Sequence, residues 1–201
     1  MKTRMFFIII VALSVTSLSG CGSVPETYYY MPTYELTAAT NDHTPLNLVL
    51  GVEKFQSEVV YSDDRIIYRE SPFEVKYYNY RRWIAEPRHL VTEKAIAHLK
   101  NSGIFRDVVA YPSIVKLDYV LRGRLLAFEE WDAEKTWHGK VAMAVELYHV
   151  ANDEIVWRST FEKMTSAEKR LPVSVVEAIS KSLSGCLDEM VASMRSSVKS
   201  N

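Results

Sequence analysis

Three successive segments in the C-terminal half, 117–128, 136–150 and 154–164, alternate apolar and polar side chains. A period of two is typical of β-strands that bury one face. Asn152 and Asp153 separate the last two segments and predict a tight turn, so these segments should form an antiparallel hairpin. A chain with so much strand sequence has to build its core on one face of a sheet.

Shorter strands are predicted earlier in the chain. Residues 46–53 place alternate aliphatic side chains on one face. Segments 59–69 and 73–80 predict a second hairpin that turns near Ser71 and Pro72.

Two helices are predicted, and each begins at a proline. Pro87 and Pro172 suit the first helical position, where the missing N–H group would be unpaired in any case. Apolar side chains follow both prolines at intervals of three and four residues, and Gly103 ends the first helix. Segment 104–111 is expected to leave that helix as an extended chain. The order of elements predicts a single α+β domain, 46–201, with an antiparallel or mixed sheet that carries both helices on one face.

The N-terminus has the pattern of a secretion signal. Two basic residues precede an apolar run, residues 5–15, which is too short to span a bilayer because a spanning helix needs about 20 apolar residues. The sequence from Leu18 to Cys21 reads Leu-Ser-Gly-Cys and resembles the lipobox of bacterial lipoproteins. Residues 1–20 are therefore expected to be a cleaved signal peptide, and Cys21 is expected to carry diacylglyceryl and acyl groups on its nucleophilic sulfur and new N-terminus. Such an anchor holds a protein on a membrane without spanning it. A plain secretion signal with a chance cysteine is the alternative.

Residues 21–45 are interpreted as a tether between the anchor and the domain. Prolines and polar side chains interrupt any helical period in this segment. It also contains Tyr28, Tyr29, Tyr30 and Tyr34. These tyrosines are expected to form a short edge strand that docks on the domain. Contact with lipid headgroups is the alternative, because a tyrosine has an apolar ring and a polar hydroxyl.

The net charge restricts the expected partners, and the number of cysteines restricts how the fold can be stabilised. Removal of residues 1–20 takes away two basic and no acidic side chains, so the net charge falls from −1 to −3. Nucleic acid is not an expected partner of such a chain. With Cys21 acylated, Cys186 has no partner within the chain, so the core has to hold the fold without a disulfide. Its apolar neighbours predict that Cys186 is a buried hydrophobic residue rather than a reactive thiol.

The sequence contains no recognisable catalytic motif. There is no Gly-x-Ser-x-Gly elbow, and the seven glycines do not gather into a phosphate-binding loop. The histidines lack the spacing and the cysteine partners of a zinc site and are interpreted as structural. They are His43, His89, His98, His138 and His149. The protein is therefore predicted to be neither an enzyme nor a holder of a metal or other cofactor.

Two pairs of acids are the remaining candidates for a hydrolase or a calcium site. Asp63 and Asp64 precede a predicted strand and are interpreted as a turn. Glu129 and Glu130 end a predicted strand and are interpreted as part of a solvated loop. A cell-wall hydrolase that uses these carboxylates is kept only as an alternative.

The stretch from residue 77 to residue 87 mixes aromatic rings with arginines. Tyr77, Tyr80, Arg82 and Trp83 are its candidates for contact with a protein partner or with lipid. In the alternative interpretation, Trp83 fills the core where strand leads into helix, and an arginine pairs with Glu86. Neither interpretation points to catalysis.

The same region resembles the periplasmic auxiliary lipoproteins of MCE-type ABC transport systems, the group that includes PqiC. The resemblance extends from residue 61 to residue 109, and outside it the chain fits only by its strand pattern and its lipobox. The matching residues are Tyr61, Arg65, Ile67, Tyr68 and Arg69, then Tyr77, Tyr80, Arg82, Trp83 and Pro87, and finally Leu99, Ser102, Gly103 and Phe105.

The resemblance implies a non-catalytic role in moving lipid across a bacterial envelope. In such systems MCE proteins form hydrophobic conduits, and an inner-membrane ATPase and permease drive transport. The lipoprotein serves them from the outer membrane, facing the periplasm, and Gly22 fits this location because an aspartate there marks retention at the inner membrane. The implied partners are an MCE protein, its ABC transporter and phospholipid. The family also implies ring-like homo-oligomers and a fold like the N-terminal domain of TolB.

A competing function is that of an assembly or scaffold lipoprotein of the TolB or LptE kind. Such a protein would bind proteins or lipopolysaccharide through an exposed face of its sheet.

Overall fold

The computed structural model describes residues 24–36, 45–133 and 135–198. The expected signal peptide 1–20, Cys21 and His43 lie outside the described residues. The elements in chain order are β1 (Tyr28–Tyr30), β2 (Leu46–Val52), β3 (Gln56–Ser57), the 3-10 helix η2 (Val59–Tyr61), β4 (Arg65–Arg69), β5 (Lys76–Trp83), α2 (Pro87–Asn101), β6 (Phe105–Ala110), β7 (Tyr119–Ala133), β8 (Thr136–His149), β9 (Glu154–Ser166) and α3 (Pro172–Val198). The predicted α+β class is confirmed.

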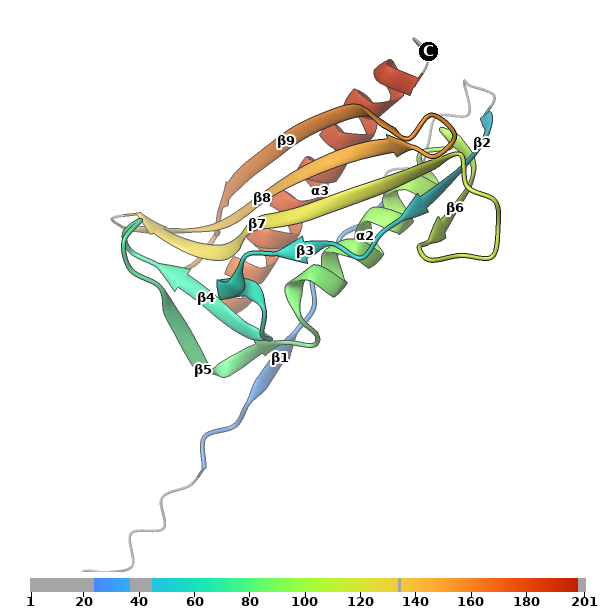
Figure 1. Cartoon of the computed structure of the whole chain (residues 1–201). Coiled ribbons are helices and arrows are strands. Elements are labelled where there is room, and N and C mark those ends of the chain that lie inside the picture. The colour runs from blue at the N-terminus through green and yellow to red at the C-terminus, as the bar shows by residue number, and fades with distance from the viewer. Residues whose placement is uncertain (1–23, 37–44, 134, 199–201) are drawn as a thin grey trace, which may run out of the picture.

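Strand β7 is the centre of a mixed sheet (Figure 1). One edge of β7 pairs with β8 in antiparallel orientation over its whole length, and β8 pairs with β9 in the same way. The other edge is shared by three parallel partners, because β2, β3 and β4 pair with the start, middle and end of β7. Strand β6 extends the sheet beyond β2, and β5 and β1 extend it beyond β4. The predicted β8–β9 hairpin is confirmed, and its turn holds Asp153 at a φ of 56°.

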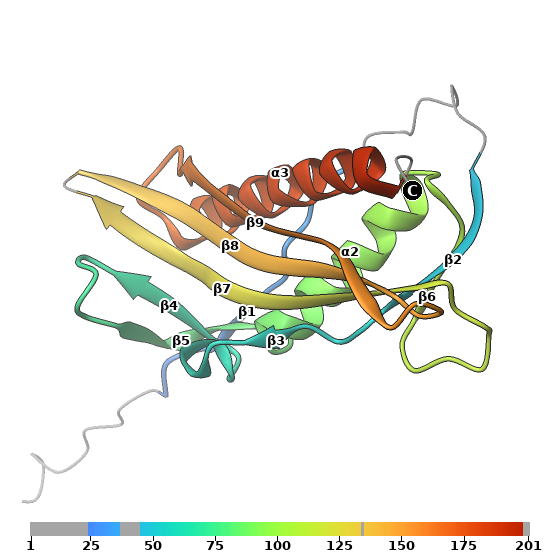
Figure 2. The same ribbon diagram turned by 45° about the horizontal axis from the view of Figure 1, so that its top comes forward.

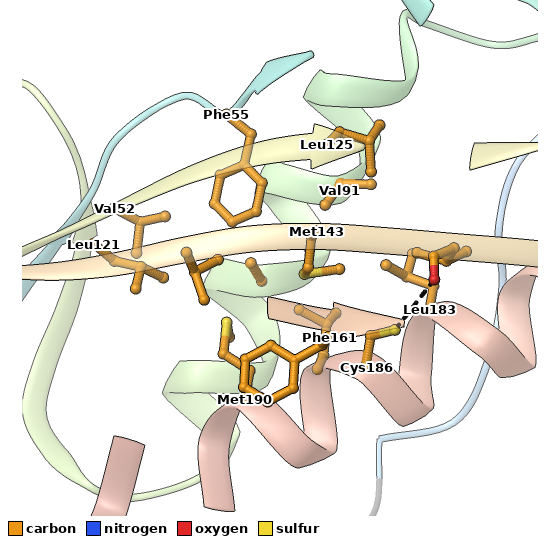
Figure 3. Close-up of a cluster of buried hydrophobic side chains, with 14 of the residues drawn as sticks. Val52, Phe55, Val91, Leu121, Leu125, Met143, Phe161, Leu183, Cys186 and Met190 are labelled. Carbon is orange, nitrogen blue, oxygen red and sulfur yellow. Dashed lines mark hydrogen bonds between the residues drawn. The ribbon is translucent and has the colours of Figure 1, made fainter. Parts of the chain in front are cut away.

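Both helices lie on the same side of the curled sheet (Figures 1 and 2). Helix α3 packs on β7, β8 and β9, and α2 packs on β6, β7 and α3. Their apolar side chains meet those of the strands in one buried cluster, in which Met143 and Leu183 lie close to Cys186 (Figure 3). The Sγ atom of Cys186 is 3.6 Å from the carbonyl oxygen of Val141, and burial raises the pKa of this thiol to about 12. Cys186 is therefore a buried hydrophobic residue, as predicted.

The close approach of α3 to β8 depends on a glycine. A Cβ atom at Gly139 would lie 2.2 Å from the backbone nitrogen of Ile179 in α3. Ser182, further along the same helix, donates a hydrogen bond to the carbonyl oxygen of Gly139 at 2.8 Å. A larger residue at this position would push the helix away from the sheet.

The predicted edge strand is confirmed for Tyr28–Tyr30, which form β1, whereas Tyr34 lies beyond its end. Strand β1 pairs in parallel with the end of β5, where Tyr28 faces Arg81 and Tyr30 faces Trp83. The pairing joins the N-terminal segment to the β4–β5 hairpin, which is itself antiparallel as predicted.

Residues 31–36 leave β1 and cross to the helices, and we call them the strap. The hydroxyl of Tyr34 lies 3.1 Å from Nδ1 of His98 in α2, and Nε2 of the same ring lies 3.1 Å from Asp188 in α3. The backbone N–H of Thr33 donates to Ser180 Oγ of α3 at 3.1 Å. The N-terminal segment is thus fixed to the sheet edge and to both helices.

The segment predicted as one strand over 59–69 is interrupted. Val59–Tyr61 forms η2, and only Arg65–Arg69 joins the sheet. Tyr61 is buried because its hydroxyl reaches a carboxylate of β7, a contact between residues far apart in the sequence. Between the two elements, Asp63 caps a bend by accepting a hydrogen bond from the backbone N–H of Arg65 at 2.8 Å, so the predicted turn is confirmed.

Candidate functional site

A hollow of about 450 Å³ lies where β1 runs beside the β4–β5 hairpin. We call it the tyrosine hollow, because tyrosines make up most of its wall. The lining residues are Pro25, Glu26, Tyr28, Tyr68, Tyr77, Tyr78, Asn79, Tyr80 and Arg81. Two of the sequence-predicted contact residues, Tyr77 and Tyr80, are therefore brought together here. Tyr68 and Arg81, which the sequence did not single out as contact residues, also line the hollow.

Basic side chains lie against the ring faces around the hollow. The guanidinium carbon of Arg65 is 4.1 Å from the centre of the Tyr77 ring, and that of Arg81 is 5.6 Å from the centre of the Tyr78 ring. The rings of Tyr68 and Tyr78 have their centres 4.7 Å apart. Because the face of an aromatic ring is electron-rich, these contacts hold positive charge beside an apolar surface.

Arg81 differs from the neighbouring arginines in its partners. Arg65 forms an ion pair with Asp63 at 2.6 Å, and Arg82 forms one with Asp64 at 2.6 Å. The Nη1 atom of Arg81 instead donates to the hydroxyl of Tyr30 at 3.2 Å, and within the described ranges Arg81 has no ion-pair partner. Its charge therefore remains available to an anionic ligand at the hollow.

Trp83 does not belong to the surface of this site. It is 0 % exposed, and its ring centre lies 4.9 Å from that of Phe128 on β7. Of the two roles that the sequence left open for Trp83, the structure supports the core role, because a fully buried ring cannot touch a partner. Glu86 does pair with an arginine, and this is Arg88 of the following helix at 2.6 Å.

Glu129 and Glu130 do not lie in a solvated loop, so that prediction is wrong. Strand β7 continues through both residues, which are 3 % and 1 % exposed. Glu129 accepts a hydrogen bond from the hydroxyl of Tyr61 at 2.6 Å and another from Nε of Arg69 at 2.7 Å. A carboxylate is tolerated inside the protein here because its charge is paired and hydrogen-bonded.

Glu130 connects the tyrosine hollow to the buried end of β7. The hydroxyl of Tyr78 lies 3.0 and 3.1 Å from the two carboxyl oxygens of Glu130. Burial raises the pKa of Glu130, and the hydrogen bond and negative charge of Asp132 raise it further. Burial also raises the pKa of Asp132. A second carboxyl group this close disfavours the ionised form of Glu130.

The described histidines make structural contacts. His98 links the strap to α3, as given above. His89 lies 3.8 Å from Glu86, His138 lies 3.3 Å from the carbonyl oxygen of Trp131, and the ring centre of His149 is 4.8 Å from that of Tyr119.

The tyrosine hollow offers groups for binding. Its rings present apolar surface, its hydroxyls present polar groups, and Arg81 presents positive charge, which together suit an amphipathic ligand or surface. In the part of the chain that the structure describes, no three His, Cys, Asp or Glu side chains gather at a metal-binding distance. None of the described helices is long and apolar enough to cross a bilayer.

A second hollow, of about 390 Å³, opens over β7, β8 and β9. Charged side chains dominate its wall, which is lined by Glu53, Lys54, Gln56, Arg122, Gly123, Arg124, Ala144, Val145, Glu146, Arg158, Ser159 and Thr160. Arg122 is paired with Glu53 at 3.3 Å and Arg124 with Glu58 at 3.0 Å. The charges of Arg122 and Arg124 are therefore balanced within the chain.

Solved structures share this fold at low sequence identity. A protein of Xanthomonas campestris is 19 % identical, with a TM-score of 0.76 over 86 % of this chain and 98 % of its own. The structure of an uncharacterized protein is 13 % identical, with a TM-score of 0.66 over 85 % of this chain and 99 % of its own. The PelC dodecamer of Paraburkholderia phytofirmans is 19 % identical over 75 % of this chain and 93 % of its own, and its TM-score of 0.44 is too low to bear on fold or assembly.

No curated protein matches the sequence at a significant level. The profile of a family described as the ABC-type transport auxiliary lipoprotein component matches residues 29–191. This range begins in β1 and ends within α3, so it includes most of the residues that line the tyrosine hollow and nearly all of the described core. The chain belongs to the ABC-type transport auxiliary lipoprotein family.

Proposed function

We propose that this protein is a lipid-anchored, non-enzymatic component of an MCE-type ABC transport system that moves phospholipid across a bacterial envelope. The observation that carries the proposal is the family match over residues 29–191. The narrower assignment to MCE systems rests on the resemblance over residues 61–109. The sheet with two helices on one side also suits the proposed likeness to the N-terminal domain of TolB.

The anchor in this proposal is Cys21, acylated after removal of residues 1–20. Strand β1 begins seven residues after Cys21. Seven residues of fully extended chain span at most about 25 Å. An acylated Cys21 would therefore hold β1 and the tyrosine hollow close to a membrane, and Gly22 favours the periplasmic face of the outer membrane.

The tyrosine hollow is the proposed place of contact with the transport system or its lipid. We keep Tyr77 and Tyr80, which line the hollow, as contact residues, and Arg81 joins them because its charge has no ion-pair partner among the described residues. Arg82 is proposed for contact beside the hollow, where its guanidinium is paired with Asp64. Ring-like assembly of several copies around an MCE conduit completes the proposal.

Purification of the acylated protein from its own membranes in gentle detergent tests this function. We expect an MCE-domain protein to copurify and phospholipid to be extracted with the complex. Cys21→Ser is the matched control, because it removes the anchor without touching the folded domain and should leave the chain in the soluble fraction. Recovery of neither an MCE protein nor phospholipid from the acylated preparation would rule the function out.

The alternative is a scaffold lipoprotein that binds proteins or lipopolysaccharide on its sheet. The second hollow favours it, because exposed Lys54 and Arg158 form no ion pair in the described residues and leave positive charge on that face. Removal of the protein would then disturb outer-membrane protein insertion and leave phospholipid balance unchanged.

A further inference from the structure

Exposed apolar side chains gather at the edge of the sheet formed by β1 and the end of β5. We call this group the β1 rim and define it as Tyr28, Tyr29, Met31, Tyr80 and Ile84, whose exposed fractions are 50 %, 63 %, 53 %, 44 % and 61 %. The members are neighbours in the fold, because Tyr28 is paired with Arg81 and the backbone N–H of Ile84 donates to the carbonyl oxygen of Tyr30 at 2.9 Å.

The composition of the rim is that of a membrane interface. Tyrosine favours the headgroup level of a bilayer, because its ring is apolar and its hydroxyl stays hydrated. Isoleucine and methionine add apolar surface that is costly to leave in water. Arg81 beside the rim can meet a lipid phosphate, because within the described chain its guanidinium contacts the Tyr78 ring and the Tyr30 hydroxyl but no carboxylate ion-pair partner.

The chain that precedes the rim is short. Val24, the first described residue, follows Cys21 by three residues and is itself 89 % exposed. Three extended residues span at most about 11 Å. Acyl chains on Cys21 would therefore enter the bilayer within a short reach of the rim.

The β1 rim is held against the rest of the molecule on two sides. On one side β1 is paired with β5, and on the other the strap is hydrogen-bonded to both helices through Tyr34 and Thr33.

The opposite end of the sheet is well separated from the β1 rim. Trp83, which is paired with β1, packs on Phe128 of β7. Phe128 lies nine residues after Tyr119, where β7 starts, and nine residues of strand span about 30 Å.

We propose that the β1 rim lies in the headgroup layer of the phospholipid membrane that carries the anchor, with the β6–β7 end of the sheet pointing away from it. This inference rests on the proposed function, because it takes Cys21 as the anchor. It adds an orientation: the tyrosine hollow opens at the membrane surface, where a lipid headgroup can reach it directly.

The test uses the acylated mature protein in vesicles of phosphatidylethanolamine and phosphatidylglycerol. Nitroxide labels are placed by Tyr29→Cys or by Ile84→Cys, two exposed positions of the rim. Ile114→Cys is the matched control, because Ile114 is fully exposed and lies in the loop between β6 and β7. Cys186 is buried and does not compete for the label.

We expect labels at 29 and 84 to be several-fold less accessible to a water-soluble nickel reagent than the label at 114, and more accessible to oxygen. Equal exposure of all three labels to nickel, while the protein floats with the vesicles, would overturn the inference and leave the anchor intact. Protection at 29 and 84 that persists in detergent and grows with protein concentration would assign the rim to contact between copies and would also overturn it. A chain that does not float with the vesicles would overturn the anchor itself and, with it, the proposed function.

Discussion

Replacement of Trp83 by alanine removes the largest fully buried side chain of the described residues. The indole is 0 % exposed and packs on Phe128 at 4.9 Å between ring centres. Burial of an aromatic side chain takes about 150 to 250 Å² out of water, which corresponds to an upper limit of about 4 to 6 kcal/mol at 25 cal/mol per Å². The surroundings relax partly around the cavity, and replacements of this kind cost about 3 to 5 kcal/mol. We expect Trp83→Ala to lower the free energy of unfolding by that amount.

Trp83→Phe separates the ring from its polar group. The indole Nε1 is buried and has no hydrogen-bond partner among the described residues. An unpaired buried donor costs about 1 to 3 kcal/mol, so its removal offsets part of the packing lost with the smaller ring. We therefore expect Trp83→Phe to cost clearly less than Trp83→Ala, because most of the ring packing is kept and the unpaired donor is removed.

Urea unfolding followed by circular dichroism measures both changes, with the mature chain carrying Cys21→Ser for solubility. The shift should appear in the midpoint at an unchanged slope, because the folded state remains compact. Ile84→Ala, at the next position and 61 % exposed, is the control and should stay within about 0.5 kcal/mol of the parent. A loss of less than about 1 kcal/mol in the free energy of unfolding for Trp83→Ala would refute the core role, since truncation of a large buried side chain costs more than that.

Three further changes test the core and the buried acids. Gly139→Ala places a Cβ atom 2.2 Å from the backbone of α3 and should cost about 3 kcal/mol in the same unfolding assay, whereas Gly185→Ala, with its nearest contact at 3.5 Å, should cost nothing by overlap. Because burial raises the pKa of Glu130 from 4.5 to about 8, the folded state binds more protons than the unfolded state over this range, so stability falls as pH rises through it. Glu130→Gln should flatten that part of the pH profile of unfolding midpoints, and an unaltered profile would show that another group titrates. Arg69→Met leaves the carboxylate of Glu129 buried without its cation and should cost about 3 kcal/mol, while the double change Arg69→Met with Glu129→Leu should cost less than the two single changes added together.

Local patterns predicted the elements whose signals are local. The β8–β9 hairpin follows from alternation and from Asp153 in its turn, and the first helix begins at Pro87 and ends before Gly103, whose φ is 63°. Each of these signals lies within the element that it defines. No such signal indicated that β7 would bind three parallel strands on one edge.

The buried acids show why the end of β7 was missed. Acidic side chains are rarely buried, so Glu129 and Glu130 were assigned to solvent. The groups that allow their burial are Arg69, Tyr61 and Tyr78, all more than 50 residues earlier in the chain. Contacts at this separation leave no periodic trace in the sequence.

The candidate site was predictable in part. Its composition identified Tyr77 and Tyr80, because aromatic residues next to arginines stand out in any sequence. Tyr28 and Tyr68 join them only through the parallel pairing of β1 with β5 and the hairpin of β4 with β5. The same composition could not decide between a contact role and a core role for Trp83, since its burial depends on Phe128 of a distant strand.

The proposed function depends most on the acylation of Cys21, which would bind the folded α+β domain to a membrane. Mass spectrometry of the protein purified from membranes tests it directly. We expect a chain that begins at Cys21 and carries a diacylglyceryl group on sulfur and an acyl group on the new N-terminus. A free thiol at Cys21, or a chain that still begins with residues 1–20, would contradict this expectation.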